Sequence, residues 1–134
     1  VATTVQAKLR ESVSVMDFGA VGDGTTDDTA AIQAALNTQR PVVLEDGKTY
    51  KTTAKLTAYD SITGDASISL ATHSTNCIEI ISRSEFEFSG FSITSTNTGS
   101  LFTDTAQGIE IQGCSNFKVE GLGITYLYPQ AMLL

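Results

Sequence analysis

Asn76–Ser95 reads NCIEIISRSEFEFSGFSITS, and Gln107–Tyr126 reads QGIEIQGCSNFKVEGLGITY. A shift of 31 residues, the difference between positions 78 and 109, superimposes the two stretches with eight identities in twenty positions. Apolar residues alternate with polar or small ones in the same phase in both stretches. The apolar set is Ile78, Ile80, Phe86, Phe88, Phe91 and Ile93, matched by Ile109, Ile111, Phe117, Val119, Leu122 and Ile124. This repeat predicts short strands stacked as the coils of a solenoid, roughly three strands to a coil.

The shared phase also predicts which side chains lie against one another. In a parallel stack each inward side chain rests on its equivalent, so Phe86 should contact Phe117 and Ile80 should contact Ile111. A slip of one residue would turn every apolar side chain outward, so the register is well specified. Two adjacent β-hairpins with accidental similarity are the alternative arrangement.

Connections between the predicted strands carry their own signals. Gly90 and Gly121 occupy matched positions where a backbone without Cβ can bend sharply, so we expect corners there. Thr96–Ala106 separates the two stretches and is predicted to be a loop that leaves the coil on one side.

The composition is that of one small folded domain. The chain has 134 residues, of which 41% are apolar. Its formal net charge is −7 and it has no basic patch, which argues against nucleic acid and favours a neutral sugar chain or a protein as partner. No transmembrane run or secretory signal occurs, so membrane insertion is not expected. Because the sequence starts at Val1 without Met and ends at Leu133-Leu134 without a polar cap, we expect a piece of a longer polypeptide.

No cofactor or metal site is predicted. Cys77 and Cys114 occupy different phases of the repeat, so we expect free, partly buried thiols without metal-site spacing. His73, the only histidine, is expected in a surface or turn position. The Gly-rich stretch Met16–Gly24 has neither a following Gly-Lys-Ser/Thr nor dinucleotide-loop spacing.

The N-terminal part divides into a neck and a helix. Residues 1–15 are predicted to be a neck or linker, either a short trimerising helix with Val5 and Leu9 on one face or a flexible lead-in. Residues 27–37 are predicted to form a helix that lies as a plug over the first coil.

Acidic residues gather at the start of this helix. Thr26 or Asp27 is expected to cap it. Asp23, Asp27 and Asp28 allow either a calcium cluster or caps and turns, and we prefer the second interpretation.

Between the helix and the repeat, strand signals continue. Pro41–Leu44 and Thr49–Leu56 are predicted strands, separated by a turn centred on Asp46-Gly47. Ser61–Leu70 is predicted to be a less regular coil, with its apolar side chains Ile62, Ile68 and Leu70 inward.

Ser12–Asn37 reads SVSVMDFGAVGDGTTDDTAAIQAALN and resembles the opening of the pectate-lyase-like right-handed β-helix proteins. DFGAVGDG followed by TDDTAAIQAAL resembles the N-terminal β-helix segment of bacteriophage tailspikes, and related forms open plant and bacterial polygalacturonases. The preceding TVQAKLRESVSV is similar to the linker that joins a tailspike's virion-binding domain to its β-helix. The resemblance implies an all-β, single-stranded right-handed parallel β-helix over residues 16–134, with one short N-terminal capping helix.

The resemblance also implies a function. It implies a homotrimeric, extracellular component of the phage tail, joined to other virion tail proteins through a missing N-terminal part and binding bacterial surface polysaccharide. Many such proteins also cleave that polysaccharide, which makes this segment the non-catalytic start of a depolymerase in a second hypothesis. A secreted pectinase is a third hypothesis, against which the linker argues.

Catalytic residues cannot be carried over from the family. Polygalacturonases have Asn-Thr-Asp, Asp-Asp, Gly-His-Gly and Arg-Ile-Lys segments, and that set does not occur here. The Asp27-Asp28 pair is assigned to the capping helix instead.

The candidates for chemistry within the chain are Glu79 and Glu110. Stacked strands place equivalent residues about 4.8 Å apart, and retaining glycosidases hold two carboxyls about 5–5.5 Å apart. Like charges that close should raise one pKa, which suits an acid. The alternative is two solvated glutamates that splay apart.

Other outward residues suggest contacts rather than catalysis. Phe102, Tyr126 and Tyr128 are candidates to stack on sugar rings in a polysaccharide, although we favour packing against a neighbouring chain. Glu87 should face Lys118 in register and can form an exposed ion pair with it.

Overall fold

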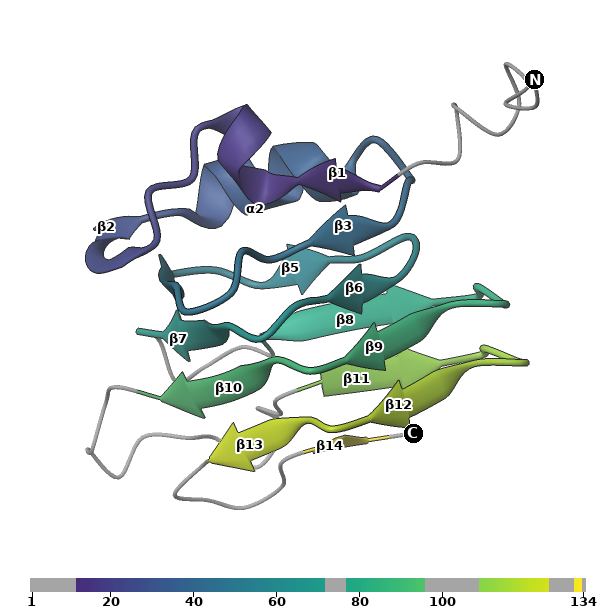
Figure 1. The fold of residues 1–134 in the computed structure, drawn as a ribbon. Helices are drawn as coiled ribbons and strands as arrows, with labels where there is room; N and C mark the ends of the chain where they lie inside the picture. The colour runs from purple at the N-terminus through teal and green to yellow at the C-terminus, as the bar shows by residue number, and fades with distance from the viewer. Residues whose placement is uncertain (1–11, 72–76, 96–108, 126–131, 134) are drawn as a thin grey trace.

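The computed structural model describes residues 12–71, 77–95, 109–125 and 132–133. Three parallel sheets make up this part of the chain (Figure 1). Sheet A contains β1 (Val13–Ser14), β3 (Val42–Val43), β6 (Ile62–Thr63), β9 (Glu87–Ser89) and β12 (Lys118–Glu120). Sheet B contains β2 (Asp23–Asp27), β4 (Thr49–Thr52), β7 (Ser67–Leu70), β10 (Ser92–Ser95) and β13 (Gly123–Thr125). Sheet C contains β5 (Leu56–Thr57), β8 (Ile78–Ile81), β11 (Ile109–Gln112) and β14 (Met132–Leu133).

The chain visits sheets A, B and C in turn, and each visit lies beside the previous one in parallel. The first full coil is β3–β4–β5, followed by β6–β7–β8, β9–β10–β11 and β12–β13–β14. Crossovers between parallel strands of one sheet are almost always right-handed. The predicted fold, a right-handed parallel β-helix, is confirmed.

The predicted register of the repeat is confirmed residue by residue. Ile78 pairs with Ile109 and Ile80 with Ile111 in sheet C. In sheet A, Phe88 pairs with Val119. The rings of Phe86 and Phe117 stack with centroids 5.1 Å apart and planes 4° apart. The inward positions of the two coils therefore form a continuous apolar column on sheet A and another on sheet C.

The coils differ in length, so the 31-residue period does not extend to the first coils. Tyr50 pairs with Ile68, Ile68 with Ile93 and Ile93 with Ile124, which gives steps of 18, 25 and 31 residues along sheet B. Most of the difference arises at one corner, because the connection from sheet B to sheet C occupies residues 53–55, then 71–77, then 96–108. Register is kept because the strands, not the connections, carry the apolar alternation.

The core is a stack of inward side chains from all three sheets. Tyr50, Phe88 and Phe91 are among the largest fully buried side chains. The predicted inward residues of the irregular coil are confirmed as buried: Ile62, Ile68 and Leu70. The hydroxyl of Tyr50 stays satisfied, since it accepts a hydrogen bond from the Glu45 N–H at 3.0 Å and donates to Met16 Sδ at 3.7 Å.

Gly90 and Gly121 lie at the predicted corner between sheets A and B, at φ +84° and +63°, and Gly64, at φ +131°, joins them there. A Cβ on Gly64 would lie 2.0 Å from the carbonyl oxygen of Leu44, and one on Gly90 would lie 3.2 Å from that of Gly64. At Gly64 and Gly90, only glycine allows the coils to approach this closely at a positive φ.

The prediction of a single strand at Thr49–Leu56 is wrong. This segment divides into β4 and β5, which belong to two different sheets. Residues 53–55 turn the chain between them. The Thr53 N–H donates to Thr29 Oγ1 at 2.9 Å instead of to a neighbouring strand. The alternating pattern runs through this corner without a glycine or proline, so it concealed the turn.

The helix α2 spans Thr29–Leu36 and starts later than the predicted 27–37. The Asp28 N–H donates to the carbonyl of Lys51 at 2.8 Å, so Asp23–Asp27 remains extended as β2. Thr26 does not cap the helix, since its hydroxyl binds Asp23. Asp27 does accept the N–H of Thr29, at 3.0 Å, as expected of a capping side chain.

The N-terminal segment closes one end of the β-helix (Figure 1). β1 covers the free edge of β3 in sheet A, and β2 covers that of β4 in sheet B. A 3-10 helix at Val15–Phe18 packs beside α2 at this end. The predicted plug is therefore present, although the short strands β1 and β2 close this end together with the helix.

Among the described residues, no strand of sheet C precedes β5, and a side chain takes the place of one. The Thr57 N–H donates to Gln33 Oε1 at 2.9 Å, and Gln33 Nε2 donates to the Thr57 carbonyl at 3.0 Å. The amide of Gln33 thus satisfies the same two backbone groups that a neighbouring strand would satisfy.

Candidate functional site

Glu79 and Glu110 lie in register on adjacent strands of sheet C, as predicted. The carboxylate of Glu79 is engaged on its other side, where Lys55 Nζ lies 3.0 Å from Oε1. This contact gives Glu79 a structural partner on the neighbouring coil, and a catalytic role of the pair stays a prediction.

On sheet A, the lysine Lys118 pairs with a different glutamate from the one expected. Glu87 and Lys118 are in register, but Lys118 Nζ binds Glu120 Oε1 of its own strand at 3.0 Å. The hydrogen bond that Lys118 donates to Glu120, the charge of Glu120 and the charge of Glu87 together raise the pKa of Lys118. Both side chains of the observed pair are exposed, so it contributes little to stability.

Several predicted residues lie outside the described part of the chain. These are the sugar-stacking candidates Phe102, Tyr126 and Tyr128, the histidine His73, the loop Thr96–Ala106 and most of the neck. Of the neck, Val13–Ser14 forms β1 and Val15 is buried in the core.

The acidic residues before α2 serve turns and caps, as we preferred. Asp28 is buried and accepts the N–H groups of Val21 and Gly22, both at 2.9 Å. Within the described residues, no group of three or more His, Cys, Asp or Glu side chains is placed to hold a metal ion.

Hydrogen bonds to two of these carboxylates favour the charged form. The pKa of Asp23 is held well below its ordinary value, chiefly by the N–H groups of Thr26 and Thr25. The pKa of Asp27 is also lowered, first by the hydroxyl and then by the N–H of Thr29. Asp23 therefore holds its own turn, and Asp27 ties the start of the helix to Thr53, most firmly when ionised.

Both cysteines are free, as predicted. Cys77 is fully buried, and the loss of hydration raises its pKa to about 12. Cys114 is half-buried, and its Sγ donates to the carbonyl of Gln112 at 3.4 Å. A buried thiol with a raised pKa is inert as a nucleophile.

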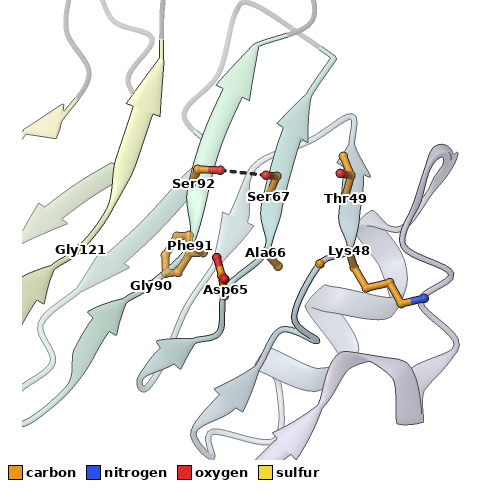
Figure 2. A pocket seen from close by; sticks show the side chains of 10 residues that line it. Lys48, Thr49, Asp65, Ala66, Ser67, Gly90, Phe91, Ser92 and Gly121 are labelled. Atoms are coloured by element: carbon orange, nitrogen blue, oxygen red, sulfur yellow. Dashed lines mark hydrogen bonds between the residues drawn. The ribbon is translucent and has the colours of Figure 1, made fainter.

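A groove of about 310 Å³ lies where sheet A turns into sheet B (Figure 2). The connections at this corner occupy residues 44–48, 64–66, 90–91 and 121–122 in successive coils. These connections shorten from five residues to three and then to two. Residues of four successive coils line the groove, which we call the corner groove.

The corner groove combines hydroxyl groups with one exposed carboxylate. Ser67 and Ser92 lie on adjacent strands with their Oγ atoms 2.8 Å apart. Asp65 is exposed at the edge of the groove, and its backbone N–H is held by Asp46 Oδ1 at 3.0 Å. Lys48 extends away from the groove toward the capping segment, as Figure 2 shows. Its stem lies over Gly22, where an added Cβ would meet Lys48 Cβ at 3.0 Å.

Sequence reasoning did not find the corner groove. Its hydroxyl column joins Thr49, Ser67 and Ser92, which are 18 and 25 residues apart and belong to coils without a shared period. The matched glycines Gly90 and Gly121 were the sequence signal for this corner. They located it in the last two coils but not the longer turns at the same corner in the earlier coils.

A family model described as "Rhamnogalacturonase A/epimerase, pectate lyase-like" matches residues 12–131, which is most of the chain. The chain belongs to this family. The match begins just before β1 and extends through β13, ending one residue before β14, so the cap and the β-helix coils up to that point form one family unit.

Similar proteins come from bacteriophages. A "Tail spike protein" of Escherichia virus K5 is 60% identical to this chain over 30 residues, which cover 22% of this chain and 5% of that protein. The solved structure of Geobacillus virus E2 ORF18 matches 88% of this chain with a TM-score of 0.65 and 22% identity. The Dettilon tailspike protein matches 89% of it with a TM-score of 0.58 and 20% identity.

The chain spans only a part of each of these proteins, namely 27% of the ORF18 structure and 24% of the Dettilon tailspike. The two structural matches establish a shared fold. No helix among the described residues is both long and apolar enough to cross a membrane.

Proposed function

We propose that this chain is the N-terminal part of the β-helix of a homotrimeric phage tailspike that attaches to bacterial surface polysaccharide. The observation that carries the proposal is the 60% identity with a tail spike protein of Escherichia virus K5. The shared fold with the Dettilon tailspike supports it. On this proposal the protein is a component of the virion tail, outside the host cell, and the parts of the tailspike that precede the neck join it to other tail proteins.

The cap suits the role proposed for this segment. Solenoids need a closed end, because an open one exposes unpaired strand edges to association. β1, β2 and Gln33 close the N-terminal edges of the three sheets. The segment thus starts the β-helix and sets the register that later coils follow.

The test uses the intact protein that contains this chain. We expect light scattering to give three times the mass of one polypeptide. We also expect the protein to adsorb to purified capsular polysaccharide or lipopolysaccharide from its host. A monomer of the intact protein would reject the tailspike assignment, and adsorption to none of the host's surface glycans would reject the attachment role.

A second function is favoured by the enzymes named in the family description, a rhamnogalacturonase and an epimerase. Under this alternative the intact protein cleaves the polysaccharide it binds, and this segment is its non-catalytic start. Incubation with host polysaccharide should then release new reducing ends or unsaturated uronates. A protein that binds the polysaccharide and releases neither product is an adhesin only.

A further inference from the structure

We propose that the corner groove is a binding subsite for a neutral, hydroxyl-rich stretch of polysaccharide. This inference rests on the proposed attachment function and assigns one place and one chemical class to it. The groove volume of about 310 Å³ is at the lower limit of the usual range for ligand sites.

The shape of the groove suits an extended chain. The groove runs across the coils, and strands of adjacent coils repeat about every 4.8 Å. Ser67 and Ser92 therefore present their hydroxyls in a row along the groove, continued by Thr49 on the preceding coil. A ligand with hydroxyls spaced along its length can follow such a row.

The hydrogen-bonding groups suit hydroxyl ligands. Each serine hydroxyl has one donor and two acceptor sites, so the pair formed by Ser67 and Ser92 retains further capacity beyond its shared bond. The Asp65 carboxylate accepts hydrogen bonds only, which sugar hydroxyls can donate. Phe91 lies under the groove but is fully buried, so recognition here rests on hydrogen bonds and not on ring stacking.

The charge of the groove selects against acidic sugars. Asp65 is exposed at its edge, while the amine of Lys48 is directed toward the cap (Figure 2). A uronate or sialate placed beside Asp65 would face a like charge, which is unfavourable. The ligand class is therefore uncharged sugar.

Glycines keep the groove open. Gly90 leaves no room for a side chain, as its Cβ would lie 3.2 Å from the Gly64 carbonyl oxygen. Gly121 is less confined, since a Cβ there would lie 3.7 Å from the Gly90 nitrogen. An asparagine at position 121 can adopt the φ of +63° and still fold, because asparagine tolerates the left-handed region. Its side chain would occupy the groove.

The experiment compares the intact wild-type protein with Gly121→Asn and with the matched control Gly113→Asn. Gly113 has nearly the same φ, +64°, but lies at the corner between sheets C and A, against Ser82 Oγ. A panel of neutral and uronate-containing bacterial surface polysaccharides identifies a bound glycan. Titration then gives its affinity, and hydrogen–deuterium exchange locates it. Light scattering follows the oligomeric state of each variant.

We expect binding of neutral glycans, slower exchange at residues 65–67 and 90–92 when one is bound, and a loss of affinity in Gly121→Asn only. One lost hydrogen bond of about 1–1.5 kcal/mol corresponds to roughly a tenfold weaker affinity. Asp65→Asn should reduce the discrimination against uronate-containing glycans.

Three results would overturn the inference. If a glycan binds but the groove shows no protection and Gly121→Asn binds normally, the attachment function stands and the groove assignment falls. If Gly121→Asn separates the subunits, the groove is a subunit contact. If no glycan binds the wild-type protein, the attachment function itself fails and this subsite fails with it.

Discussion

Replacing Gln33 with alanine should open the capped edge of sheet C without disturbing the other two sheets. The side chain makes two hydrogen bonds to the backbone of Thr57, at 2.9 and 3.0 Å. Alanine keeps the helix, since it has the highest helix propensity. The change therefore isolates the contribution of the amide to the edge strand.

The expected magnitude follows from the two bonds. Each intramolecular hydrogen bond contributes about 0.5–1.5 kcal/mol net, so the free energy that opens β5 locally should fall by about 1–3 kcal/mol. Exchange of the Thr57 amide with deuterium should become roughly 5 to 150 times faster. Mass spectrometry of peptides from residues 54–60 measures this rate.

Asn37→Ala is the matched control. Gln33 Nε2 also donates to Asn37 Oδ1 at 3.0 Å, on the exposed side of the helix. Loss of that contact should leave Thr57 exchange nearly unchanged, because the bonds to the strand remain. Unchanged Thr57 exchange in Gln33→Ala would refute the argument that a side chain replaces the missing strand.

Three further predictions concern thiols, acid and backbone strain. Iodoacetamide at neutral pH should modify Cys114 in the native protein but Cys77 only after unfolding, since burial raises the pKa of Cys77 to about 12; equal labelling in peptide mass spectra would contradict this. Asp23 and Asp27 have pKa values lowered from the ordinary 3.8, so their contribution to stability is present above that value and lost as pH falls through the lowered ones. The double variant with Asn at both positions should therefore show a flatter decline of Tm between pH about 4 and about 2 than the wild-type protein. Glu85 has a left-handed φ of +61°, so Glu85→Gly should raise the free energy of unfolding by about 0.5–1 kcal/mol. The relief of roughly 1–2 kcal/mol of left-handed strain exceeds the roughly 0.5–1 kcal/mol entropy cost of glycine. A lower Tm of the variant would contradict the expectation.

The repeat was predictable in register because two coils share both length and sequence. Ile78 and Ile109 are identical and are followed by identical residues, Glu79-Ile80 and Glu110-Ile111, so one alignment defines every pair. The earlier coils carry the same inward alternation, but their connections are shorter and no alignment relates them. Individual strands of these coils could be predicted from the sequence, whereas which strand pairs with which could be seen only in the structure.

Other features depend on tertiary contacts that no local pattern encodes. The turn at residues 53–55 is stabilised by Thr29 from the cap, and nothing within Thr49–Leu56 marks it. The late start of α2 depends on the bond from Asp28 to Lys51. Glu79 looked free for chemistry because its partner, Lys55, lies 24 residues earlier on a coil of different length.

The connection from sheet B to sheet C takes up most of the variation in coil length, while the strands on either side keep their register. A position with this property can accept insertions of different lengths at little thermodynamic cost, since closing a longer loop costs only about 0.6 kcal/mol for each doubling of its length. Evolution can therefore diversify this edge of the molecule independently of its interior, and a foreign peptide or epitope grafted between β10 and β11 should be displayed without refolding the scaffold.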